Sequence, residues 1–170
     1  MKIVQAQNCD IAVIASVLRE CVRHMTAQGS DQWDDVYPNT ESVAEDVRSR
    51  SAYMAMDDSA CIGAITLNEV QEPEYRSILW LTDSPRVLVV HRLAVRPELQ
   101  GRGIAGRLMD FAEDFAVANG YASIRLDAYT GNPRALALYD SRGYVRTGQV
   151  YFPRRILPFY CYEKVLSTLK

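Results

Sequence analysis

The chain has 170 residues, of which 48% are hydrophobic, and these values predict one globular domain over residues 1–170 with a sizeable core. The formal net charge of −2 gives no electrostatic reason to expect binding to nucleic acid or to an anionic membrane. The 4 cysteines are scattered and, with only 2 histidines, show no metal-ligand spacing. The first long apolar run, residues 11–18, is far shorter than the roughly 20 residues of a membrane span. These features favour a reduced, metal-free, cytoplasmic protein.

The hydrophobic pattern predicts strands and helices in a defined order. Strand-like runs cover residues 2–6, 51–56, 60–70, 87–95, 123–128, 144–150 and 156–166. Helical spacing covers residues 11–27, 41–50, 104–119 and 133–141. The order is strand, two helices, three strands, helix, strand, helix and two strands. It predicts an α/β fold in which helices cover both faces of a mixed sheet.

Two connecting segments, residues 30–39 and 71–86, combine aromatic and acidic side chains. The second is unusually long for a hairpin connection, and long insertions with aromatic residues often form binding surfaces. Their aromatic candidates for ligand binding are Trp33, Tyr37, Tyr75 and Trp80. A cation over a Trp ring gains ~0.5–2 kcal/mol, and neighbouring carboxylates attract it as well. We therefore predict a cationic amine ligand here, with packing in the core or in a dimer interface as the alternative.

The chain changes character between residues 87–95 and the helical spacing that starts at Ile104. Gly101, Gly103 and Gly106 punctuate this turn into the helix. The first N–H groups of a helix have no partners within it, and glycines let a phosphate come close to the backbone. Arg102 adds positive charge. The unit is therefore predicted to bind a phosphate-bearing ligand, unless the glycines merely turn the chain.

A dinucleotide is one alternative ligand for this loop. Residues 101–106 read G-R-G-I-A-G, which satisfies the G-x-G-x-x-G pattern, and Asp127 lies near the usual position of the ribose-binding acid. In the dinucleotide fold, however, the first glycine follows the strand almost directly, whereas here residues 96–100 intervene. A dinucleotide-binding oxidoreductase is thus the weaker reading. The lysine-containing loop of nucleoside triphosphatases is absent from the sequence.

A second motif, in residues 132–144, pairs with the glycine loop. H-R-L-A-V-R-P-E-L-Q-G-R-G-I-A, residues 91–105, resembles the acyl-CoA-binding signature of the GCN5-related N-acetyltransferase (GNAT) family. Its Q-x-x-G-x-G/A pattern falls on Gln100, Gly103 and Ala105. The continuation N-x-x-A-x-x-L-Y-x-x-x-G-[FY] falls on Asn132, Ala135, Leu138, Tyr139, Gly143 and Tyr144. The resemblance is specific over residues 87–146, and the segment around Trp33 and Tyr37 looks like that of a small bacterial subset of the family.

The resemblance implies the acyl-CoA N-acyltransferase fold, with a twisted, mostly antiparallel sheet of about six to seven strands flanked by helices. It also implies acetyl-CoA as acetyl donor and no metal. The implied cofactor-binding residues are Leu93, Ala94, Val95, Gln100, Gly101, Arg102, Gly103, Ile104, Ala105, Gly106, Asn132 and Tyr139. Asn132 has a second explanation as a helix cap followed by proline.

The resemblance assigns the general acid to Tyr139, since a phenol of pKa ~10 can protonate a thiolate whose conjugate acid has a pKa near ~8.5. His91 is the candidate base, because it stands two residues before Leu93 and strand alternation places both on one face. Arylalkylamine-acetylating members also carry histidine there. Many other members use a glutamate where this chain has Val89, so Glu69 and Glu74 remain substitutes.

The function that these features predict is transfer of the acetyl group of acetyl-CoA to a primary amine, by direct attack in a ternary complex. The acceptor is a small-molecule amine or a peptide amine, and neither nucleic acid nor membrane is an expected partner. A non-catalytic acyl-CoA sensor is the competing class. Members of the family are often homodimers, and the sequence leaves the oligomeric state open.

Overall fold

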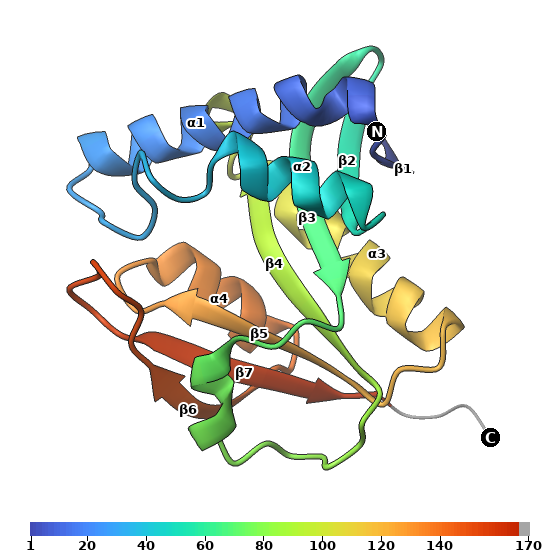
Figure 1. Cartoon of the computed structure of the whole chain (residues 1–170), viewed down its shortest axis with the longest axis vertical. Coiled ribbons are helices and arrows are strands. Elements are labelled where there is room, and N and C mark those ends of the chain that lie inside the picture. Colours follow the sequence, from blue (N-terminus) through green and yellow to red (C-terminus); the bar gives the residue numbers. More distant parts are fainter. Residues whose placement is uncertain (167–170) are drawn as a thin grey trace. The chain divides into compact units, whose positions relative to one another are not determined.

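The computed structural model describes residues 1–166 and contains strands and helices in the predicted order (Figure 1). The strands are β1 (Lys2–Gln5), β2 (Ala52–Asp57), β3 (Ala60–Asn68), β4 (Val87–Val95), β5 (Ser123–Tyr129), β6 (Val145–Val150) and β7 (Phe159–Val165). The helices are α1 (Ile11–Ala27), α2 (Thr40–Arg48), α3 (Ile104–Ala118) and α4 (Pro133–Ser141). Short 3-10 helices, which the hydrophobic pattern did not predict, cover Asn8–Asp10, Pro73–Ser77 and Pro97–Leu99.

The strands form a 7-stranded mixed sheet, and hydrogen-bonded neighbours follow the order β1-β2-β3-β4-β5-β7-β6. The β1–β2, β2–β3, β5–β7 and β6–β7 pairs are antiparallel. The β4–β5 pair is parallel, with Val87 opposite Ser123 and Val89 opposite Arg125. The predicted α/β class, with a mixed and mostly antiparallel sheet of about six to seven strands, is confirmed.

The chain divides into two compact units. Unit 1 consists of Met1–Leu67 and His91–Ala112, and unit 2 of Asn68–Val90 and the described residues from Glu113 onward. The unit boundaries run through β4 and α3, so each of these elements contributes residues to both units. The predicted domain end at residue 170 lies outside the described residues.

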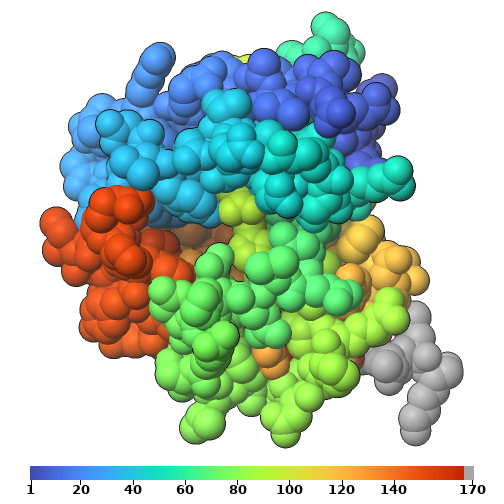
Figure 2. Space-filling view, viewed as in Figure 1, coloured from blue at the N-terminus to red at the C-terminus, as the bar shows by residue number. Residues whose placement is uncertain are grey.

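The core of unit 1 forms under the apolar stripes of α1 and α2. Ile14, Leu18 and Cys21 are buried on α1 at helical spacing, and α2 buries Val43 and Val47. These side chains pack with buried residues of β2 and β3. Figures 1 and 2 show the two helices side by side, in blue and cyan, over the surface of this unit.

A glycine in β3 allows a close approach between two strands of unit 1. A Cβ atom at Gly63 would lie 2.7 Å from the carbonyl oxygen of Ala94 in β4. Real side chains essentially never make so short a contact with backbone, so any other residue at position 63 would displace one of the strands. Gly63 therefore sets the position of the second half of β4, which carries several of the predicted cofactor-binding residues.

The core of unit 2 forms between strands β4, β5, β6 and β7 and the segment of residues 71–86. Its buried cluster consists of Tyr75, Val89, Tyr129, Val150, Phe159 and Cys161. The helix α4 begins as predicted, because the side-chain oxygen of Asn132 accepts a hydrogen bond of 3.2 Å from the backbone N–H of Ala135 and Pro133 occupies the first helical position.

Candidate functional site

The glycine-rich loop of unit 1 is fastened to the end of β4 by side chains. The amide nitrogen of Gln100 donates a hydrogen bond of 3.1 Å to the carbonyl oxygen of Val95, and the thiol of Cys21 donates to the same oxygen at 3.3 Å. Gln100 was predicted from the family resemblance to bind the cofactor. In the structure its side chain joins the start of the loop to the strand.

The loop between Gln100 and α3 adopts a backbone that favours glycine. Gly101 and Gly103 have φ angles of +78° and +80°, in the left-handed region that L-residues rarely adopt. A Cβ atom added at Gly101, Gly103 or Gly106 would meet no heavy atom within 4 Å. The three glycines and Arg102 therefore border open space at the N-terminus of α3, where a helix favours an anion. A pyrophosphate fits this arrangement.

The alternation assumed for His91 and Leu93 is broken at Arg92. Arg92 has a φ of +46°, although it lies within β4 and is not a glycine. Residues on either side of such a position do not follow the two-residue period of a regular strand, so the argument that placed His91 and Leu93 on one face does not hold. His91, Arg92 and Leu93 are all partly exposed, whereas the rest of β4 is buried.

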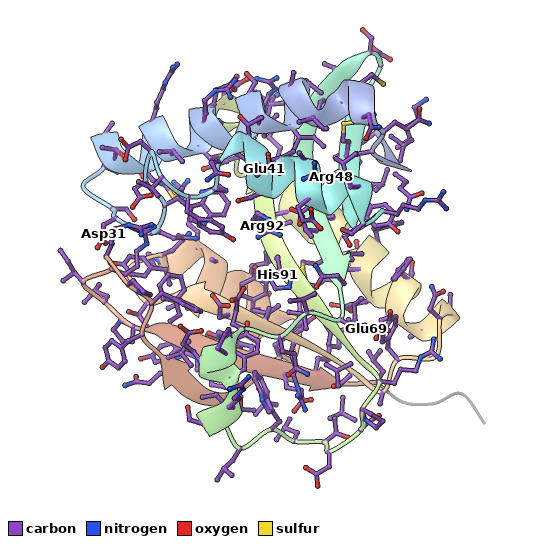
Figure 3. The ribbon with its side chains drawn as sticks, viewed as in Figure 1. Asp31, Glu41, Arg48, Glu69, His91 and Arg92 are labelled. Carbon is purple, nitrogen blue, oxygen red and sulfur yellow. The ribbon has the colours of Figure 1, made fainter. Side chains whose placement is uncertain are left out.

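The guanidinium group of Arg92 contacts two other segments of unit 1. It forms a bidentate ion pair with Asp46 of α2, at 2.7 Å from Nε and 2.6 Å from Nη2, and its Nη1 donates to the phenol oxygen of Tyr37 at 2.6 Å. The hydroxyl of Thr66 donates to Asp46 at 2.9 Å. Figure 3 shows Arg92 on β4 next to His91. The sequence pattern predicted no functional role for Arg92, Asp46 or Thr66.

The predicted aromatic ligand-binding residues are distributed over both units. Trp33 of unit 1 is partly buried and packs against the hydrophobic cluster beneath α1, and Tyr37 is the hydrogen-bond partner of Arg92. In unit 2, Tyr75 is only 2% exposed and belongs to the core, while Trp80 packs against its edge. The rings of Tyr75 and Trp80 meet edge to face, with centroids 5.1 Å apart.

Tyr139 of α4 is buried in unit 2. The centroid of its ring lies 5.9 Å from that of Tyr144 and 5.7 Å from that of Tyr162. Burial raises the pKa of its phenol far above the ordinary value, and electrostatic interaction with Asp127 and Tyr162 acts in the same direction. The phenol therefore keeps its proton throughout the physiological pH range. The protonated phenol can donate a hydrogen bond, but a pKa so far above that of a thiol makes proton transfer to a thiolate less favourable than it is for a phenol of ordinary pKa.

A carboxylate with a perturbed pKa lies near Tyr139 and Tyr75. The phenol oxygen of Tyr75 donates a hydrogen bond of 2.6 Å to Asp127 on β5. Burial raises the pKa of Asp127 to about 6, which the hydrogen bond from Tyr75 opposes and the charges of Glu72 and Glu74 reinforce. A carboxyl group that titrates near neutrality is common at functional sites, so this pair adds to the candidate residues of unit 2.

A buried ion pair fastens residues 71–86 to the strands of unit 2. Glu163 of β7 is fully buried and accepts hydrogen bonds from Ser123 at 2.6 Å and Arg125 at 2.9 Å. Its other carboxylate oxygen accepts from the backbone N–H groups of Leu81 and Thr82. Arg125 in turn donates to the carbonyl oxygen of Thr82 at 2.6 Å and to the side chain of Gln71 at 2.8 Å, and its guanidinium carbon lies 4.3 Å from the centre of the Trp80 ring.

The two substitute bases also lie in unit 2. Glu69 accepts a hydrogen bond of 2.9 Å from the phenol of Tyr121 at an exposed position. Glu74 lies in the 3-10 helix Pro73–Ser77 and contributes to the raised pKa of Asp127.

Some of the functional residues that the sequence pattern did not predict nevertheless have a recognisable sequence context, and others have none. Asp46 interrupts the apolar stripe of α2, three residues after Val43 and one before Val47, and a charge in such a stripe indicates a buried partner. Arg125 and Glu163 likewise sit in strand runs that are mostly buried. The left-handed backbone at Arg92 has no sequence signal, because arginine gives no conformational preference for it.

Two other kinds of site can be assessed over residues 1–166. Within that range no group of three or more His, Cys, Asp or Glu side chains could hold a metal ion. None of the helices there is long and apolar enough to cross a membrane.

The fold is similar to that of solved acetyltransferases. A GNAT-family acetyltransferase from Streptococcus agalactiae superposes with a TM-score of 0.84 at 24% identity, over 98% of this chain and 95% of that one. The structure of yncA from Salmonella typhimurium, with its cofactor acetyl-CoA, gives a TM-score of 0.74 at 19% identity, over 98% and 94% of the two chains. At 24% and 19% identity, these similarities show the fold of the chain and nothing further.

Sequence comparison extends over most of the chain. The uncharacterized N-acetyltransferase YhfO from Bacillus subtilis is 29% identical over 159 residues, which are 89% of this chain and 95% of YhfO. Other curated relatives match over shorter stretches, and the aligned part covers less than half of their own length. The family model described as "Acetyltransferase (GNAT) family" matches residues 16–144, more than half of the chain. The chain therefore belongs to the GNAT family of acetyltransferases.

Proposed function

We propose that this chain transfers the acetyl group of acetyl-CoA to a primary amine, by direct attack of the amine in a ternary complex. The observation that carries the proposal is the loop from Gln100 to Gly106, which leaves open space beside a helix N-terminus and fits a pyrophosphate. Family membership and the acetyl-CoA of the yncA structure support the choice of donor. When bound, acetyl-CoA supplies the acetyl group as an activated thioester.

The residues of this chain are proposed to act in three ways. Gly101, Gly103 and Gly106 admit the pyrophosphate, and Arg102 supplies positive charge. The main chain of Leu93, Ala94 and Val95 and the side chain of Asn132 hold the pantetheine. The backbone N–H of Leu93 donates a hydrogen bond to the acetyl carbonyl oxygen, where preorganised donors contribute most to catalysis.

Proton transfer is assigned to His91 and Tyr139. His91 accepts the proton of the attacking amine, directly or through water, because imidazole is basic near neutral pH. Tyr139 donates its proton to the departing sulfur. Its raised pKa keeps the phenol protonated before the transfer and makes the transfer less favourable than it is for a phenol of ordinary pKa.

The acceptor is proposed to be a small-molecule or peptide amine, and its ammonium is attracted by Trp33, Tyr37, Tyr75 and Trp80. Because Tyr75 is buried in the core of unit 2, its contribution is made through its hydroxyl and Asp127 rather than through an exposed ring face. A neutral amine is the reactive form, so the acidic groups that attract the ammonium act before its deprotonation.

The proposed function is tested by measuring thiol release from acetyl-CoA with phenethylamine, spermidine, free lysine and an alanine-led peptide as acceptors. Release that depends on an amine, with the N-acetylated product identified by mass spectrometry, is the expected result. Tight binding of acetyl-CoA without turnover of any amine would instead support the acyl-CoA sensor. If calorimetry detects no binding of acetyl-CoA, both the acetyltransferase and the acyl-CoA sensor are overturned.

The acceptor surface is tested separately. Trp33→Ala is expected to raise KM for the amine about tenfold while the Kd of acetyl-CoA stays constant. Met25→Ala is the matched control, because Met25 packs against the same hydrophobic cluster as Trp33 and is not assigned to amine binding. Tyr75→Phe keeps the ring in the core and removes only the hydroxyl. Equal amine KM in Trp33→Ala and Met25→Ala would show that Trp33 serves packing.

A further inference from the structure

The backbone of β4 is strained at one residue. Arg92 adopts a φ of +46°, where the Cβ of an L-residue crowds the neighbouring carbonyl oxygen. Strain of this kind persists only where the surrounding structure determines it. Arg92 directly precedes Leu93, so its conformation sets the direction of the peptide N–H of Leu93.

The guanidinium group of Arg92 is held by three hydrogen bonds to two partners. Both oxygens of Asp46 accept from it, at 2.7 and 2.6 Å, and the hydroxyl of Tyr37 accepts at 2.6 Å. The side chains of Arg92 and Asp46 are only 13% and 9% exposed, so water screens this pair weakly. A bidentate pair fixes the plane of the guanidinium group as well as its distance, which a single contact does not.

The carboxylate of Asp46 is itself fixed. It belongs to α2, between the buried Val43 and Val47, and it accepts a further hydrogen bond of 2.9 Å from Thr66 of β3. The helix and the neighbouring strand thus both determine where the carboxylate lies. A rigid acceptor at this position pulls the side chain of Arg92 toward α2 and opposes relaxation of residue 92 to ordinary strand geometry.

We propose that Asp46 is a positioning residue for acetyl transfer: through its bidentate pair with Arg92 it holds the left-handed backbone at residue 92 and so directs the N–H of Leu93 toward the acetyl carbonyl oxygen. The inference rests on the proposed function. It also links amine binding to this backbone, because Tyr37, one of the proposed acceptor residues, shares the guanidinium group with Asp46.

Substitutions at Arg92 distinguish an ion pair that only joins α2 to β4 from an ion pair that also holds the backbone conformation of residue 92. Glycine adopts a φ of +46° without a Cβ clash, whereas alanine does not. Arg92→Gly and Arg92→Ala both remove the guanidinium group. They differ in whether the backbone conformation stays accessible, so comparison of the two separates the roles.

The experiment measures kcat and the amine KM by thiol release, with the most reactive amine of the panel above, and the Kd of acetyl-CoA by calorimetry. Asp46→Asn is expected to lower kcat at least tenfold and to change the Kd less than threefold. Arg92→Gly is expected to retain at least fivefold more kcat than Arg92→Ala. Glu41→Ala is the matched control, because it breaks the exposed ion pair of the same helix with Arg48 and is expected to leave kcat unchanged (Figure 3).

Folding of each variant is checked by circular dichroism and thermal unfolding. Equal kcat in Arg92→Gly and Arg92→Ala, or a folded Asp46→Asn with kcat within twofold of the wild type, would overturn the inference while the proposed function stands. If Asp46→Asn fails to fold, the glycine and alanine pair decides. A wild-type chain that releases no thiol with any amine defeats the proposed function itself, and the inference with it.

Discussion

The phenol of Tyr75 donates a hydrogen bond of 2.6 Å to the carboxylate of Asp127, in surroundings that otherwise disfavour negative charge. Burial and the charges of Glu72 and Glu74 outweigh the hydrogen bond, so that the pKa of Asp127 rises from 3.8 to about 6. The folded chain therefore binds this proton more tightly than the unfolded chain does. This pKa difference makes the stability of the fold depend on pH.

The sign of the pH dependence follows from the raised pKa. The stabilisation by the bound proton is complete below a pH of about 3.8 and is lost as the pH rises to about 6. Asp127→Asn cannot titrate, so it does not lose this stabilisation as the pH rises. The free energy of unfolding of Asp127→Asn minus that of the wild type should therefore increase by up to about 3 kcal/mol between pH 4 and pH 7. Urea unfolding at several pH values measures this, with Asp83→Asn at an exposed position as control. A difference that stays constant with pH contradicts the prediction.

Gly106→Ala should separate stability from cofactor binding. Gly106 is the third residue of α3, and its added Cβ would meet no protein atom within 4 Å. Alanine is the better helix former by up to about 1 kcal/mol, so the melting temperature should rise or stay the same. The methyl group enters the space proposed for pyrophosphate, and the Kd of acetyl-CoA should increase about tenfold.

Calorimetry and thermal unfolding of Gly106→Ala check both parts of this prediction. Asp114→Ala is the control, because Asp114 lies at an exposed position of the same helix and is not assigned to binding. An unchanged Kd in a Gly106→Ala variant that is as stable as the wild type would argue against pyrophosphate at this position.

Tyr139→Phe should lower kcat about 100-fold with little change in the Kd of acetyl-CoA. The phenyl ring retains the packing of the buried side chain between Tyr144 and Tyr162, and only the proton is lost. Steady-state and single-turnover kinetics measure the effect on the chemical step. If the chemical step limits turnover and kcat stays within twofold, Tyr139 is a packing residue.

Glu163→Gln should destabilise unit 2 by about 3–5 kcal/mol, because it leaves Arg125 buried beside a neutral side chain. Denaturant unfolding measures the loss. Asp140→Asn breaks the more exposed ion pair with Arg146 and serves as the control, for which little change is expected. A similar stability of the two variants would show that the hydrogen bonds to Glu163 do not depend on its charge.

The order of the strands and helices was predictable because local patterns determine it. The dipeptide Asn132-Pro133 marks the start of α4 by a cap and a fixed φ, and both effects act within one turn of helix. Gly101 and Gly103 were selected as loop residues, and their φ angles are positive. The sequence signature also led to the correct family, since its residues cluster within the matched region.

Residues that depend on distant partners were not predictable in the same way. Asp46 and Arg92 are 46 positions apart, and their pairing needs α2 and β4 to lie together. The strand pattern at residues 87–95 indicates burial but carries no information on the φ angle of a single residue. The break in alternation at Arg92 could therefore not be predicted. The sequence offered Tyr75 as a ligand-binding aromatic with core packing as the alternative, and it gave no signal for its pairing with Asp127, which lies 52 residues away. The ring of Tyr75 lies in the core.

The anchoring of residues 71–86 has a consequence for directed evolution. Glu163 is bound by the main-chain N–H groups of Leu81 and Thr82, and every residue except proline supplies such a group. The side chains of Leu79 and Leu81 are 88% and 50% exposed. A library randomised at these two positions should therefore yield mostly folded variants, with the segment retained at the same anchors.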